Sequence, residues 1–184
     1  TVVRQLHYSN KNENSIDMGL FLNGLPIVTM ELKNQLTGQN VKHSENQYRN
    51  DRDYKEPLLQ FKRCMVHFCV DNNKVSMTTR LSGSKTFFLP YNQDLENPSV
   101  ENGYRTKYLW EQILTPTSLL DIIESFVHLS KEKEFFFNDK TQKIDTKIKE
   151  VLIFPRYHQL DLIRKFRGQL KVDGPGKNYL VQHT

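Results

Sequence analysis

The chain has 184 residues, 37% of them hydrophobic, and a formal net charge of +5, which allows one sizeable domain and part of a second. We expect neither a membrane span nor a secretory signal, because no long apolar run and no basic-then-apolar segment is present. The basic charge is consistent with a polyanionic partner but does not identify one.

The first expected elements are a strand over residues 1–8 and a hairpin over residues 16–33, whose two apolar runs are joined by Asn23-Gly24. A hairpin loop with an odd number of residues would place Asp17 directly across from Glu31. A strict two-residue turn would instead place Asp17 beside Met30, on the face away from Glu31. The sequence leaves both registers open.

In the first register, two carboxylates share one face of the hairpin with Lys33, a pattern that predicts a metal-dependent hydrolytic site. Asp17 and Glu31 would bind Mg²⁺, with the carbonyl of Leu32 as a third oxygen. Lys33 would orient the attacking water or neutralise the transition state. The alternative is a surface ion pair worth about 0 to 1 kcal/mol. Placement within apolar strands, where unneeded charge is costly, favours the site.

The middle of the chain predicts a helix over 44–54, with an apolar stripe over 58–61 that extends it as a bent helical region over the sheet. Cys64 and Cys69 are expected to be free, buried thiols of a protein in a reducing cytoplasm. Expected strands cover 64–70, 74–81 and 87–89, the first of them buried on both faces.

An irregular loop over 92–106 and a short apolar stripe over 108–114 should precede the clearest amphipathic helix, over 117–129. Thr117 or Ser118 should cap this helix. Its expected buried stripe is Leu119, Leu120, Ile123, Phe126 and Val127.

The charge-rich segment 131–150 is expected to be a connection, with a domain boundary near residue 150. Beyond Pro155 the pattern predicts a helix with Leu160, Ile163 and Phe166 on one face, then a turn over 171–177. A strand is expected to begin over 179–182.

The hairpin, from Asp17 through Asn23-Gly24-Leu25-Pro26 to Glu31-Leu32-Lys33-Asn34, resembles the PD-(D/E)xK nuclease core of the restriction (R) subunits of type I restriction-modification enzymes. The similarity continues in order through later phrases and so spans most of the chain. These phrases are CMVHFCVDNNKVSMTTRL, FFLPYN, LLDIIESF and RYHQ.

The resemblance implies an α/β fold with a mixed central sheet and flanking helices, restriction-endonuclease-like, over residues 1–150. The start of a RecA-like helicase or translocase motor domain would follow over residues 151–184. Asp17 and Glu31 would bind the metal and Lys33 would be the catalytic lysine. Gln47 would assist cleavage as part of a QxxxY motif, although the fourth position after it holds Asp51.

Arg156 and Gln159 lie where the family's motor recognises the adenine of ATP, although a charged helix start explains them equally well. The implied protein is an ATP-dependent endonuclease subunit that cleaves double-stranded DNA with Mg²⁺ while translocating it. Its expected partners are methyltransferase and specificity subunits, the latter reading the DNA sequence. The alternatives are another PD-(D/E)xK restriction or repair nuclease, and a non-catalytic DNA-binding domain.

Overall fold

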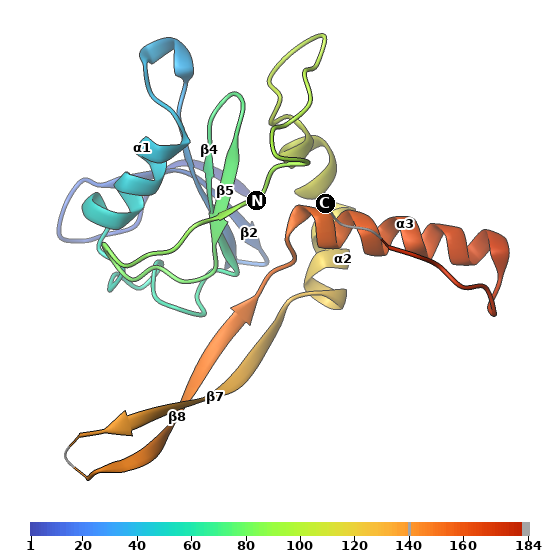
Figure 1. Cartoon of the computed structure of the whole chain (residues 1–184). Coiled ribbons are helices and arrows are strands. Elements are labelled where there is room, and N and C mark those ends of the chain that lie inside the picture. The colour runs from blue at the N-terminus through green and yellow to red at the C-terminus, as the bar shows by residue number, and fades with distance from the viewer. Residues whose placement is uncertain (140, 182–184) are drawn as a thin grey trace.

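A mixed sheet of six strands forms the centre of the protein, shown in Figure 1 as a computed structural model that describes residues 1–139 and 141–181. The strands are arranged in sequence order, and only β3 and β4 run parallel. Their bounds are β1 Val2–His7, β2 Ser15–Leu22, β3 Leu25–Leu32, β4 Val66–Val70, β5 Val75–Thr78 and β6 Leu89–Pro90.

Helices cover both faces of this sheet, as the sequence predicted. The connection from β3 to β4 supplies η1 (Gln35–Thr37), α1 (Val41–Asn46) and η2 (Gln47–Asp51). The opposite face is covered by η3 (Leu109–Ile113), α2 (Pro116–Ser125) and α3 (Tyr157–Asp173). Within the described residues, no helix is long and apolar enough to cross a membrane.

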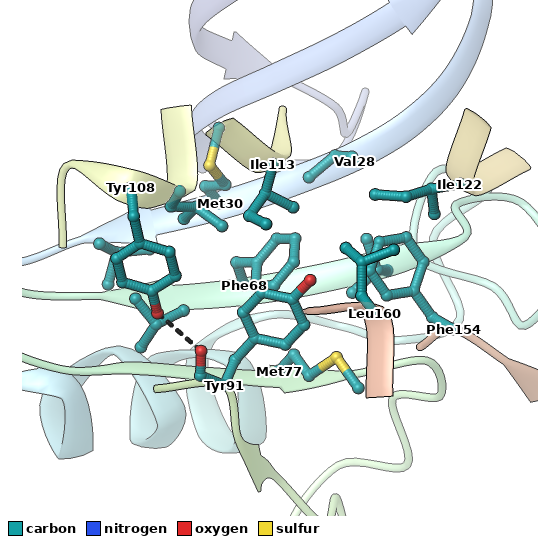
Figure 2. Close-up of a cluster of buried hydrophobic side chains, with 14 of the residues drawn as sticks. Val28, Met30, Phe68, Met77, Tyr91, Tyr108, Ile113, Ile122, Phe154 and Leu160 are labelled. Atoms are coloured by element: carbon teal, nitrogen blue, oxygen red, sulfur yellow. Dashed lines mark hydrogen bonds between the residues drawn. The ribbon is translucent and has the colours of Figure 1, made fainter. Parts of the chain in front are cut away.

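The two faces of the sheet differ in chemistry. The face toward η3, α2 and α3 holds the main apolar core, in which Phe68 contacts Tyr91 and Phe154 edge-on (Figure 2). The hydroxyl of Tyr108 donates to the carbonyl of Tyr91 at 2.6 Å, which ties η3 to the end of the sheet. The face toward α1 has a second, smaller apolar cluster, with Ile16, Tyr48 and Cys69 among its members. It also carries buried polar side chains, namely Thr29, Glu31, His67, Ser76 and Thr78.

Several predicted elements need correction. The helix expected over 44–54 begins earlier, at Val41, and its second half is the π-helix η2. Residues 58–61 form turns rather than an extension of that helix. The third strand is short, β6 covering only Leu89–Pro90, and the stripe over 108–114 forms the π-helix η3.

Helix α2 begins at Pro116, after Thr115, and was predicted one residue late. Leu120 is 51% exposed, whereas Ile122, absent from the predicted stripe, is fully buried. Positions 119, 122, 123 and 126 follow the spacing of a single helical face. Leu120 falls outside that face, so the predicted stripe was wrong at this position.

The charge-rich segment 131–150 is not a connection but most of a two-stranded antiparallel arm, β7 (His128–Asn138) with β8 (Lys143–Ile153). The arm projects away from the rest of the protein (Figure 1). In β7 four consecutive charged residues precede three consecutive phenylalanines, so this strand lacks the alternation of polar and apolar residues that would have predicted it.

Residues after 150 pack on the central sheet. The predicted boundary lies inside β8, and Phe154 and Leu160, exposed by 3% and 1%, belong to the main apolar core. Helix α3 confirms the predicted helix and extends to Asp173, into the expected turn. No strand forms over 179–181, and residue 182 lies outside the described residues. The division into two domains stays a prediction.

Replacing Phe154 with alanine should lower the free energy of unfolding by about 3–5 kcal/mol, because it leaves a cavity between Phe68 and Tyr91. Chemical denaturation of the 184-residue chain measures this change. Val172→Ala is the control, since Val172 is 80% exposed and should change stability by about 0.5 kcal/mol at most. Equal effects of the two substitutions would contradict the packing of this segment on the sheet.

Candidate functional site

The register of the β2–β3 hairpin combines both predicted alternatives. The turn holds only Asn23 and Gly24, both with positive φ (49° and 81°), and Leu22 pairs with Leu25 across it. A bulge next to the turn then shifts the register, so that Met18 pairs with Met30. Continued by one residue, this shifted register places Asp17 beside Glu31.

Asp17 is anchored to the end of β3 by its carboxylate. Its Oδ2 accepts a hydrogen bond from the backbone N–H of Leu32 at 2.7 Å, and its Oδ1 accepts from Nε2 of Gln5 at 3.3 Å. The carboxylate therefore replaces a backbone acceptor where the β2–β3 ladder ends. This holds Asp17 against the residue that follows Glu31.

Glu31 is fully buried and its two carboxylate oxygens have different surroundings. Oε1 accepts from Nε of Arg52 at 2.7 Å, whereas Oε2 is buried without a hydrogen-bond partner among the described residues. Burial raises the pKa of Glu31 to about 7, against the opposing effect of Arg52 and with a further increase from Asp17. The surface ion pair considered as an alternative does not fit a carboxylate in this position.

Lys33 lies just beyond β3, where the parallel β4 positions it. Its backbone N–H donates to the carbonyl of Val70 at 2.8 Å, continuing the β3–β4 ladder by one bond. The side chain is half-buried, and its ammonium group makes no hydrogen bond or ion pair within the described part of the chain. An amine is thus available two residues after Glu31.

Gln47 opens the π-helix η2, on the face of the sheet that carries Glu31. Its side-chain Oε1 is a second buried oxygen without a hydrogen-bond partner among residues 1–139 and 141–181. The backbone of Arg52 donates to the carbonyl of Gln47 at 3.1 Å. Arg52 therefore connects the helix that carries Gln47 to the carboxylate of Glu31, a role that no sequence motif indicated.

A buried polar chain lies beside these residues and was also missed. The hydroxyl of Tyr48 lies 2.8 Å from Oγ1 of Thr29, which lies 2.6 Å from Nδ1 of His67. Burial lowers the pKa of His67 to about 3, so its ring is neutral at physiological pH. Tyr48 directly follows Gln47 and so does not have the spacing of the expected QxxxY motif. Its position next to Gln47 was nevertheless a possible signal of a role in the site.

The oxygen donors fit a hard cation. Asp17 and Glu31 offer carboxylate oxygens and Gln47 an amide oxygen, and hard oxygens are what Mg²⁺ prefers. Among the described residues, Oε2 of Glu31 and Oε1 of Gln47 are buried without a hydrogen-bond partner. In the described part of the chain, no three His, Cys, Asp or Glu side chains group as a complete metal site. A Mg²⁺ ion held here would therefore use few protein ligands, and the Leu32 carbonyl stays a predicted one.

Residues 1–86 match the family described as type I restriction enzyme R protein N terminus. The match covers 86 of the 184 residues, slightly less than half of the chain. Over these residues it confirms the sequence resemblance to the N terminus of R subunits. No curated protein and no solved structure matches the chain.

The matched segment contains Asp17, Glu31, Lys33 and Gln47, but not the two residues predicted to contact adenine. Arg156 and Gln159 lie at the start of α3, across the sheet from Glu31. Oε1 of Gln159 accepts from the backbone N–H of Arg156 at 3.1 Å and so caps the helix. Their role toward ATP stays a prediction.

Glu31→Gln should stabilise the metal-free protein increasingly as pH rises. The folded-state pKa lies above the ordinary value of 4.5, so stability from the neutral acid is complete below pH 4.5 and is lost as pH rises through about 7. Glutamine has no such loss, and the difference between variant and parent should grow by about 3 kcal/mol over this window. Denaturation in a chelator across this pH range measures it.

Glu101→Gln is the matched control, because Glu101 is exposed and makes no ion pair among the described residues. Its stability difference from the parent should stay constant over the same pH window. A constant difference for Glu31→Gln as well would contradict the raised pKa.

Proposed function

We propose that this chain is the endonuclease part of a type I restriction enzyme R subunit, and that its central sheet and flanking helices form a restriction-endonuclease-like fold. It would hydrolyse phosphodiester bonds of double-stranded DNA with Mg²⁺. The observation that carries the proposal is the unpartnered Oε2 of Glu31, buried beside Asp17 and two residues before Lys33. A buried oxygen without a hydrogen-bond partner does not stabilise the fold, so binding of a ligand is the best explanation for its presence.

Each residue of the site has a chemical role in this proposal. Asp17 and Glu31 would hold Mg²⁺, which when bound polarises the scissile phosphate and lowers the pKa of its water. Lys33 would offer its ammonium group to the negative charge that develops on the phosphate. The side-chain oxygen of Gln47 would accept a hydrogen bond from the attacking water and so help to orient it.

Arg52 would act on the same site through Glu31. Its guanidinium favours the ionised form of the carboxylate, which is the form that binds a cation. The hydrogen bond to Oε1 also fixes the orientation of the carboxylate, so that Oε2 is directed elsewhere. The ion pair thus prepares one oxygen for a ligand while neutralising part of the buried charge.

In the full protein, cleavage would be coupled to ATP-driven translocation by a motor domain that begins near residue 151. Arg156 and Gln159 would contact the adenine of ATP there. Methyltransferase and specificity subunits would be its partners, and the specificity subunit would read the DNA sequence. The nuclease itself would then contact mainly phosphates, with which a net charge of +5 is compatible.

Lys33→Ala should abolish Mg²⁺-dependent DNA cleavage by the assembled enzyme while ATP hydrolysis continues, because Lys33 acts only on the scissile phosphate. A plasmid linearisation assay and a phosphate-release assay on the same preparation separate the two activities. Lys55→Ala, at an exposed lysine of the same family segment, should leave both unchanged. Undiminished cleavage by Lys33→Ala would remove the catalytic assignment.

Asp17→Asn and Glu31→Gln should each weaken binding of Mg²⁺ to the 184-residue chain at least about tenfold, because each removes a charged oxygen donor. Titration calorimetry at pH 8 measures this without any cleavage, and Glu101→Gln again serves as the control. Unchanged affinity in both variants would mean that these carboxylates are not the metal ligands.

A further inference from the structure

The outer part of the β7–β8 arm, beyond the contact of Glu150 with Lys62, has one face that nothing in the described chain covers. Its strands pair without a break from His128 with Ile153 to Asn138 with Lys143, so alternate residues of each strand share a face. We name one of these the aromatic face. Its exposed apolar side chains are Phe135 (69%), Phe137 (57%), Ile144 (71%) and Ile148 (62%).

The opposite face of the arm is charged rather than apolar. There, Glu132 lies opposite Lys149 and Glu134 opposite Lys147, so that opposite charges face each other across the strands. An isolated two-stranded ribbon is only marginally stable in water unless an apolar face is covered. Contiguous exposed apolar side chains also mark interaction sites. The aromatic face therefore requires a partner surface.

The arm itself carries a surface that matches the aromatic face. Lys133 lies at the near end of this face and Asp139 in the turn at its far end, each three residues from position 136. A two-fold axis between Phe135 and Phe137 would place Phe135 of each copy over Phe137 of the other copy. It would also place Lys133 of each copy over Asp139 of the other, where opposite charges attract.

We propose that the aromatic faces of two copies of this chain pack against each other, with their arms antiparallel, as a small four-stranded sandwich. The contact uses the same patch twice and so closes as a dimer. This proposal does not depend on the nuclease function. The four apolar side chains would bury on the order of 500 Å² per copy, less than the roughly 800 Å² of a stable interface. The dimer is therefore weak, with a dissociation constant in the micromolar range.

A nucleic acid fits this surface less well. Residues 128–153 contain six lysines and five acidic residues, so the arm is almost neutral, whereas binding to phosphates depends on net positive charge. Glu134 and Asp145 would also approach a phosphate backbone laid along the charged face. Charge and exposed apolar area together favour a second copy.

Sedimentation equilibrium of the 184-residue chain, from about 1 µM to about 1 mM, tests the proposal. The mass should rise from that of the monomer towards twice that value. The double variant Phe135→Lys, Phe137→Lys should weaken association at least about tenfold. Phe136→Lys is the matched control, because Phe136 is 45% exposed on the same strand but belongs to the other face. Circular dichroism confirms that the variants fold.

A charge exchange tests the antiparallel arrangement. Lys133→Asp and Asp139→Lys should each weaken association, and the two together should restore it. A monomer at every concentration would overturn the proposal, and so would an equal effect of Phe136→Lys. One further result would make the arm a nucleic-acid surface and overturn the proposal too. In that result, the parent chain stays monomeric and binds a fluorescent DNA duplex, and only the aromatic-face variants lose this binding.

Discussion

The ion pair between Arg52 and Glu31 is the contact on which the arrangement of the site depends. Both side chains are buried, so each needs the other: removing one partner of such a pair typically costs about 3–5 kcal/mol. Arg52 follows η2, and Glu31 lies in the middle of the sheet. The pair therefore holds a helix layer against a strand by charge, in addition to the apolar cluster on this face.

The same layer is joined to the sheet by a second charged contact. Glu45 of α1 is buried and accepts hydrogen bonds from Ser76 of β5 and from Arg49. Such contacts are directional, whereas apolar contacts tolerate sliding. The α1 face therefore has less freedom to repack than the opposite face, where Phe68, Tyr91 and Phe154 meet. The candidate site lies on the face of the sheet that carries these directional contacts.

Local patterns predicted the hairpin and the strands of the central sheet, but not the β7–β8 arm or the contacts that complete the site. Five buried residues in a row identified β4, and Asn23-Gly24 identified the turn. No local sequence pattern predicts the bulge beside that turn. The bulge lets both Ile27 and Val28 enter the apolar core, and this core forms from segments that are distant in sequence. Arg52 was missed for the same reason, since its partner lies 21 residues away in sequence.

The family match ends at residue 86, between strands β5 and β6 of the sheet. The folded unit continues beyond this residue. Residues 1–86 contribute Val28, Met30 and Phe68 to the apolar face of the sheet, but the side chains that cover this face come from after residue 86. A polypeptide ending at the match would expose that face to solvent and tend to aggregate. The region of family similarity therefore leaves out the segments that cover the apolar face of the sheet.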